Sequence, residues 1–242
     1  MKTKKIFVGM PSWTWFPYPD VIMNVLRQEL PEWYEIYFPK ENIISGRPVH
    51  IARNLLVSMF VRSDCDYLWF VDDDNPPSID VLKYLIECNE DVASALVPLR
   101  HGWYTLNLTV NWDWLTSIEK YWEEKFEVEN VGTGCVLLTR KIIIDMCYHT
   151  WHEPYHFTRK IYVFNEQTKE AEEYTHQDIH IKGWQNIYRK NNFEIEKQYV
   201  DVSEDLYFWQ IARDLWYKFY AHPLARCRHY KQNREFISVK NI

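Results

Sequence analysis

The sequence has few glycines, and it lacks the glycine-rich loops of the common nucleotide-binding folds. Only 6 of its 242 residues are glycine, and neither GxGxxG nor GxxxxGK[ST] occurs. The first motif forms the pyrophosphate turn of Rossmann dinucleotide sites, and the second forms the phosphate loop of P-loop NTPases. Neither site is supported. A nucleotide held by the aromatic, proline-broken segment 13–19 would bind by stacking and backbone contacts, unless that loop only closes over the core.

Paired cysteines and long apolar runs are also missing. The five cysteines are odd in number and form no CxxC pair. This pattern fits a reducing compartment and argues against a disulfide scaffold or a cysteine-rich zinc site. No apolar run approaches the ~18 residues of a membrane span, and the run after Met1 is too short for a signal peptide. We expect a cytoplasmic protein without a transmembrane segment, and peripheral membrane contact stays open.

Positive charge is scarce, whereas aromatic residues are abundant. The formal net charge is −6 and no basic stripe occurs, so we expect no nucleic-acid partner. Aromatic residues make up 17% of the chain. They indicate either stacking surfaces of the kind that sugar and nucleoside sites use, or a bulky core. The length suits a single α/β domain over residues 1–242.

The most informative stretch is an apolar run that leads straight into three acids. Residues 67–71 are apolar, Asp72, Asp73 and Asp74 follow, and two prolines come soon after. Such a run predicts a strand buried on both faces, and the carboxyl ends of such strands are where open α/β sheets bind ligands. Crowded carboxylates repel one another unless a cation neutralises them, and Mg²⁺ or Mn²⁺ suits their oxygens. The alternative is a solvated acidic turn.

Hydrophobic spacing predicts alternating strands and helices around this stretch. We expect a mostly parallel central sheet flanked by helices, with Asp20 and Ser78 as helix N-caps. The expected strands are 6–12, 34–38, 67–71, 91–98 and 226–230, and the expected helices are 20–30, 49–62, 78–87 and 203–216.

Residues 148–202 are the least regular part of the chain. We interpret them as a lid or acceptor-binding insertion, and residues 231–242 as a polar tail. His149, His152 and His156 lie at helical spacing that could bind a metal, but Pro154 interrupts that helix. Ordinary surface histidines are the alternative.

Four stretches, taken in order, resemble GT-A fold glycosyltransferases, in particular compact family 2-like members. Residues 70–74 look like the D-x-D motif at the end of a strand, and Ala52 to Asn54 precede that strand. Residues 132–138 are similar to the glycine strand of the acceptor side. Residues 203–205, followed by His229, look like the x-E-D motif and the C-terminal metal-binding histidine. The resemblance covers residues 4–230 and implies a Rossmann-like GT-A domain.

The resemblance implies a metal-dependent glycosyltransferase that moves one sugar from a UDP- or GDP-sugar to a hydroxyl of a glycan or another acceptor. A Mn²⁺ or Mg²⁺ ion would neutralise the departing diphosphate. By the family's pattern, Asp72 and Asp74 face the ion and the ribose, and His229 completes the coordination. Asp73 would point away, although its acidity leaves the register ambiguous.

Asp205 matches the general base of an inverting transfer, with Glu204 as the second candidate. A carboxylate in the first turn of a helix is stabilised as the anion, so acceptor binding would have to raise its basicity. An ordinary helix-capping sequence is the alternative for residues 203–205. Retention is equally open, because retaining GT-A enzymes share the D-x-D motif and the histidine.

Donor binding is expected from several residues along the chain. Pro11 and Ser12 match the region that holds the base and the ribose in relatives. Arg53 matches a position near the donor, and Arg226 or Arg228 could reach the diphosphate. Candidates for stacking on sugars are Trp103, Trp151, Tyr155 and Phe157. His222 departs from the family pattern and competes with His229 as a ligand.

Two other function classes stay open. The aromatic surplus also suits a non-catalytic carbohydrate-binding protein. The same acids could serve a nucleotidyltransferase or a metal-dependent phosphoesterase, although segment 11–19 lacks the glycine- and basic-rich loop that a nucleotidyltransferase usually carries.

Overall fold

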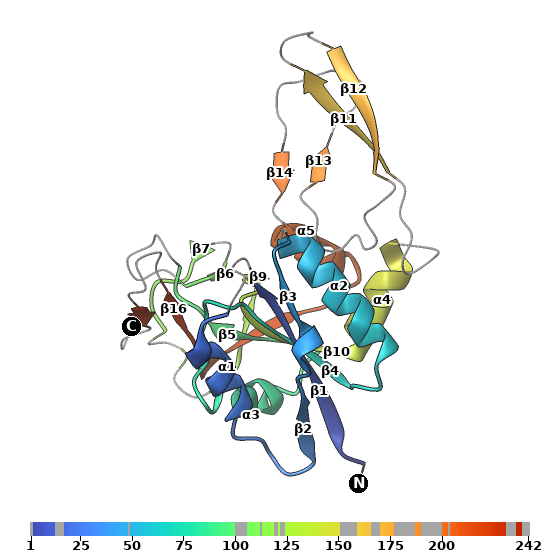
Figure 1. The fold of residues 1–242 in the computed structure, drawn as a ribbon. Helices are drawn as coiled ribbons and strands as arrows, with labels where there is room; N and C mark the ends of the chain where they lie inside the picture. The colour runs from blue at the N-terminus through green and yellow to red at the C-terminus, as the bar shows by residue number, and fades with distance from the viewer. Residues whose placement is uncertain are drawn as a thin grey trace.

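The computed structural model shows a mixed α/β domain (Figure 1). It describes residues 2–12, 17–47, 49–99, 106–111, 113–118, 121, 124–150, 159–165, 170–176, 187–189, 200–202, 204–230 and 236–238. For residues 50, 148–150, 159–165, 170–176, 187–189, 200–202, 204–207, 210 and 236–238, the description extends only to the backbone.

An eight-stranded sheet forms the centre of the domain. Its strand order is β2-β1-β4-β10-β5-β15-β8, and β3 pairs with the far end of β1. The strands are β1 (Lys4–Ser12), β2 (Tyr34–Tyr37), β3 (Ile43–Ser45), β4 (Tyr67–Val71), β5 (Val92–Leu96), β8 (Phe126–Val128), β10 (Cys135–Thr139) and β15 (Phe219–Arg226).

Most strands of this sheet run in one direction, as the sequence predicts. β1 is parallel to β2, β3 and β4, and β5 is parallel to β15. Two strands oppose them, because β10 is antiparallel to both β4 and β5, and β8 is antiparallel to β15. The expected parallel relation of β4 and β5 is therefore correct, but β10 lies between them.

Helices cover both faces of the sheet (Figure 1). The expected burial of β4 on both faces is confirmed, since Leu68 to Val71 are fully buried. Leu68 and Phe70 join the core beneath one set of helices, and Trp69 and Val71 join the core beneath the other. The first set is α2 (Val49–Arg62), α4 (Arg140–Thr150) and α5 (Glu204–Asp214), and the second is α1 (Pro19–Leu26) and α3 (Val81–Glu87).

Two predicted helix starts are wrong. The N-cap of α1 is Tyr18, with Pro19 at the first helical position and Asp20 inside the first turn. Proline is favoured there because its fixed φ suits a helix start and its missing N–H would have no helical partner. α3 begins at Val81 with Asp80 as its N-cap, and the amide of Ser78 donates to the carbonyl of Arg226.

Arg140 binds the C-terminal end of α2, the helix that carries Arg53. Its guanidinium donates hydrogen bonds of 2.6–3.1 Å to the carbonyl oxygens of Phe60, Val61, Ser63 and Cys65. A cation is favourable there, because the last carbonyls of a helix carry partial negative charge and lack helical donors.

Smaller elements surround the sheet. A three-stranded sheet has the order β7-β6-β9, and three two-stranded pairs are β11–β12, β13–β14 and β16–β17. Figure 1 shows β11 and β12 well away from the main sheet. The bounds are β6 (Leu108–Val110), β7 (Asp113–Trp114), β9 (Asn130–Val131), β11 (Arg159–Asn165), β12 (Glu170–His176), β13 (Ile187–Arg189), β14 (Val200–Val202), β16 (Arg228–Tyr230) and β17 (Phe236–Ser238), with a 3₁₀ turn at Lys40–Asn42.

In the described part of the chain, every helix is too short or too polar to cross a bilayer.

Candidate functional site

Residues 226–230, at the end of β15 and in β16, form what we call the C-terminal strand. It runs antiparallel along the acidic turn that follows β4, residues 72–78. Residues 74, 76 and 78 pair through their backbones with residues 230, 228 and 226. The bonds are Tyr230 N to Asp74 O (2.9 Å), Arg228 N to Pro76 O (3.0 Å) and Ser78 N to Arg226 O (3.0 Å). Prolines suit this ladder because each can still accept a bond, although it cannot donate one. The pairing places His229 beside the acids.

Further backbone contacts hold the acidic turn from other sides. The amide of Asp72 donates to the carbonyl of Gly134 (2.9 Å), just before β10, and the amide of Tyr18 donates to the carbonyl of Asp73 (3.4 Å). The side-chain amide of Asn24, in α1, donates to the carbonyl of Pro77 (2.8 Å). The turn is therefore fixed by segments from both ends and the middle of the chain.

Asp74 and His229, which are 155 positions apart, meet at this turn. The Nε2 atom of His229 lies 3.4 Å from Oδ2 of Asp74, and both side chains are only 14% exposed. The Nδ1 atom of His229 lies 2.7 Å from the carbonyl oxygen of Pro98. A carbonyl can only accept, so Nδ1 carries the proton. In the neutral ring, Nε2 then presents its lone pair to the carboxylate.

This pair fits a divalent cation. At 3.4 Å it is longer than a charge-assisted N–H···O bond, which is about 2.7–2.9 Å. Two ligands at about 2.1 Å from one octahedral ion lie about 3 Å apart, close to the distance seen here. The bond from Nδ1 to a backbone carbonyl is also the usual support of a metal-binding histidine.

The described side chains alone would not complete such a site. Among the residues that the structure describes, no group of three or more His, Cys, Asp or Glu side chains could hold a metal ion. Mg²⁺-type sites often use one or two carboxylates and take their other ligands from substrate phosphates and water. Asp74 and His229 match that kind of site better than an all-protein cage.

Asp72, which the sequence predicts to face the ion or the ribose, binds Arg53. Its Oδ1 atom lies 2.7 Å from Nη2 of Arg53, whose side chain is 3% exposed. A guanidinium buried this deeply needs a partner, since desolvating an unpaired charge is costly. The pair explains why a cation is tolerated near the start of α2. It also neutralises one of the three acids without a metal.

Asp73 faces the first strand. Its Oδ2 atom accepts a 2.6 Å hydrogen bond from the hydroxyl of Ser12, and both residues are buried. Pro11 pairs with Ile44 of β3. The structure therefore joins the acidic turn to the end of β1, where the sequence predicts the base and ribose, and it uses the Ser12 hydroxyl in that junction.

The two C-terminal arginines are placed differently. Arg226 folds back on its own strand, with Nε donating to the carbonyl of Pro223 (2.8 Å). Arg228 is 43% exposed, and its Nη2 atom lies 3.7 Å from Oδ2 of Asp20. Arg228 neighbours His229 on β16, so its side chain lies on the face opposite the imidazole, toward Asp20.

The proposed base lies at the expected end of its helix. α5 begins at Glu204, so Asp205 occupies the first turn, as the sequence predicts. The side chains of Glu204 and Asp205 are outside the described part of the structure. The stacking candidates Trp103, Trp151, Tyr155 and Phe157 fall outside the described residues, as do His152 and His156, and His149 is described only in its backbone.

His222, the competing ligand, is a packed histidine. Its ring stacks on Tyr84 of α3 with centroids 5.0 Å apart, and its Nδ1 accepts a hydrogen bond from the amide of Leu224 (3.2 Å). Burial lowers the pKa of His222, and the nearby Glu87 carboxylate opposes that shift.

Gly134 is a site residue whose role needed the structure. Its backbone does not require positive φ, but a Cβ at this position would lie 2.2 Å from Nδ2 of Asn75 and 3.4 Å from Oδ2 of Asp72. The neighbour proves to be the acidic turn itself.

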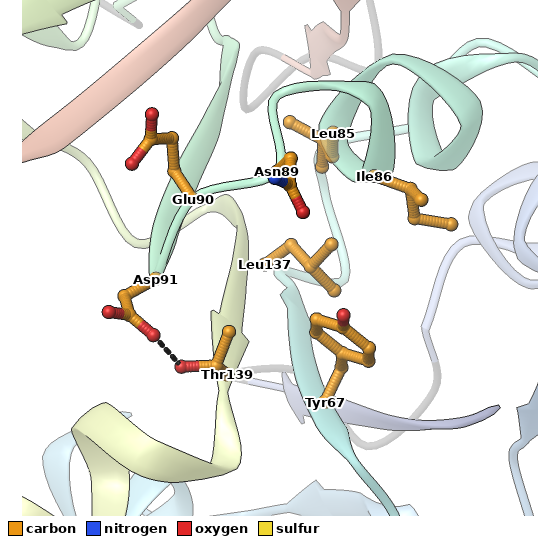
Figure 2. Close-up of a pocket in the computed structure, with 8 residues that line it drawn as sticks. All are labelled: Tyr67, Leu85, Ile86, Asn89, Glu90, Asp91, Leu137 and Thr139. Carbon is orange, nitrogen blue, oxygen red and sulfur yellow. Dashed lines mark hydrogen bonds between the residues drawn. The ribbon is translucent and has the colours of Figure 1, made fainter.

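A small pocket of about 210 Å³ lies at the opposite end of β4 (Figure 2). Tyr67, the first residue of β4, and Leu137 of β10 form part of its wall. Its polar groups already bind within the protein, since Thr139 donates to Asp91 and the hydroxyl of Tyr67 accepts from Lys4. This pocket is separate from the acidic turn.

Comparisons with known proteins support the fold. No protein-family model matches the sequence, and no curated protein matches it. The solved structure of A197 from STIV aligns over 99% of this chain and 95% of its own, with a TM-score of 0.56 and 18% identity. This likeness shows a shared fold.

Weaker matches include S. aureus TarS 1–349 in complex with UDP (TM-score 0.36, 14% identity, 58% of this chain and 48% of that one). The match to TarS 1–349 in complex with UDP-GlcNAc has a TM-score of 0.34 and 12% identity, and it covers 59% of this chain and 47% of that one. The chain thus spans about half of TarS 1–349.

The buried His222 predicts a loss of stability in mild acid. Because its folded pKa is lowered, the unfolded chain binds a proton first as the pH falls below about 6.5. The free energy of unfolding should then fall until the folded pKa is passed. Urea titrations between pH 8 and 5 should show a shallower decline for His222→Gln than for wild type. Parallel declines would contradict this.

Proposed function

We propose that this protein is a metal-dependent GT-A glycosyltransferase that moves one sugar from a UDP- or GDP-sugar to an acceptor hydroxyl. Four motifs in family order support the proposal, and the meeting of Asp74 with His229 is the observation that carries it. Neither residue type nor spacing forces a histidine of β16 to lie beside an acid of the turn after β4.

In this proposal Asp74 and His229 hold a Mn²⁺ or Mg²⁺ ion, which neutralises charge on the departing diphosphate. The carbonyl of Pro98 orients the imidazole. Asp72, fixed by Arg53, faces the ion or the ribose, and Arg226 or Arg228 binds a phosphate oxygen. Ser12 and Asp73 shape the end of β1 where the base and ribose lie, next to Pro11.

Asp205 is the proposed base that takes the proton of the acceptor hydroxyl in an inverting transfer, with Glu204 as its substitute. A carboxylate in the first turn of α5 is favoured as the anion, which is the form that accepts a proton. Positioned general bases of this kind contribute about 10²–10⁴-fold to rate.

The ion site predicts nucleotide binding that depends on metal. UDP or GDP with Mn²⁺ should raise the Tm of the wild-type protein, and a matching nucleotide sugar should be slowly hydrolysed. Asp74→Asn and His229→Gln should each lose both effects because they remove an ion ligand. Asp145→Asn, which alters a surface carboxylate bound by Lys141 and Tyr217, is the matched control.

Other outcomes would favour the rival functions. Stabilisation by glycans without metal would indicate a carbohydrate-binding protein. Turnover of nucleoside triphosphates or phosphate esters, with no hydrolysis of nucleotide sugars, would indicate a nucleotidyltransferase or phosphoesterase.

Asp205 predicts a separation of binding from transfer. Asp205→Asn should lower kcat for transfer by about 10²–10⁴-fold. The Kd for donor should stay within about twofold, because the residue contacts the acceptor. Isothermal titration with donor and Mn²⁺, alongside initial-rate assays, checks both. A collapse of donor binding would instead make Asp205 a structural residue or an ion ligand.

A further inference from the structure

Two tyrosines from opposite ends of the chain stack beside the acidic turn. The rings of Tyr18 and Tyr230 lie 4.1 Å apart at an interplanar angle of 14°. The hydroxyl of Tyr230 donates a 2.6 Å hydrogen bond to Oδ2 of Asp20, in the first turn of α1. We call Tyr18, Asp20 and Tyr230 the tyrosine clasp.

The clasp is also bonded to the acidic turn through its backbone. The amide of Tyr18 donates to the carbonyl of Asp73, and the amide of Tyr230 donates to the carbonyl of Asp74. Two neighbouring acids are therefore held by two residues that also hold each other. This closed arrangement resists sliding of the C-terminal strand along the turn.

Tyr230 directly follows His229 on β16, and neighbouring side chains of a strand point to opposite faces. A Tyr230 ring held on one face therefore restricts the imidazole on the other. The bond from Nδ1 of His229 to Pro98 then sets the rotation of the ring. Together, the clasp and Pro98 determine where Nε2 lies relative to Asp74.

We propose that the tyrosine clasp is a positioning element that sets the affinity of the Asp74–His229 site for its divalent ion. The proposal rests on the function proposed above. The clasp residues act through His229 and do not contact the ion. Groups that orient a metal-binding histidine typically change metal affinity by about 10–100-fold when they are removed.

Within the clasp, the hydroxyl of Tyr230 is the group to test. Tyr230→Phe keeps the stacked ring and removes only the bond to Asp20. The contact of Arg228 with Asp20 is long and partly exposed, so it cannot replace that bond. Asp20→Asn retains an oxygen that accepts the hydroxyl, so it should preserve most of the effect.

Tyr217 offers a matched control. Its hydroxyl donates a 2.5 Å hydrogen bond to Oδ2 of Asp145 on α4, so Tyr217→Phe deletes the same kind of bond within another cluster. Tyr217 follows α5, and the partners recorded for its hydroxyl, Asp145 and Lys141, are both on α4. Any general cost of losing a tyrosine–carboxylate bond should appear in both variants.

The experiment is a titration of the protein with Mn²⁺ in the presence of UDP or GDP. The EPR signal of free Mn²⁺ measures how much of the ion is bound. Tyr230→Phe should weaken Mn²⁺ binding about tenfold. Asp20→Asn should lie near wild type and Asp20→Ala near Tyr230→Phe, while Tyr217→Phe should match wild type. Thermal unfolding shows whether each variant is folded. If Tyr230→Phe does not fold, the Mn²⁺ affinities of Asp20→Asn and Asp20→Ala are compared instead.

The outcomes separate the two proposals. If wild type binds Mn²⁺ and Tyr230→Phe binds it as tightly as Tyr217→Phe does, the clasp is only structural and this inference is overturned. If wild type does not bind Mn²⁺ with either nucleotide, the proposed ion site fails first, and the inference fails with it.

Discussion

The candidate site depends on the pairing of one proline-containing turn with the end of β15 and with β16. Backbone bonds between residues 74–78 and residues 226–230 fix the register, and a shift by one residue would turn His229 to the other face. Asn24 and the backbones of Tyr18 and Gly134 secure the same turn. This backbone pairing therefore brings one carboxylate and one imidazole to the same turn.

Each of the three acids after β4 has a different partner, which limits their mutual repulsion. Asp72 pairs with the buried guanidinium of Arg53, and Asp73 accepts a bond from Ser12. Asp74 faces an imidazole whose other nitrogen is tied to a carbonyl. From the sequence, the crowding of three carboxylates suggested that a cation neutralises them. In the structure, Asp72 and Asp73 have partners within the protein. At Asp74, two electron-donating atoms, a carboxylate oxygen and Nε2 of His229, face each other at 3.4 Å.

Local patterns predicted the elements that carry the site. The apolar run gave β4, and the helical spacing gave α2 with its observed bounds, Val49–Arg62. The starts of α1 and α3 were missed, since Pro19 opens α1 and Asp80 is the N-cap of α3. The Arg53–Asp72 pair, the insertion of β10 between β4 and β5, and the clasp depend on contacts across the fold. Hydrophobic periodicity carries no record of such contacts.

The central claim is that one divalent ion sits between Asp74 and His229. Anomalous diffraction at the manganese edge, from crystals grown with Mn²⁺ and UDP or GDP, tests it most directly. The account predicts one peak about 2.1–2.3 Å from a carboxylate oxygen of Asp74 and from Nε2 of His229, with the diphosphate on the same ion. A bound nucleotide with no peak there, or with the ion held by other residues, would contradict it.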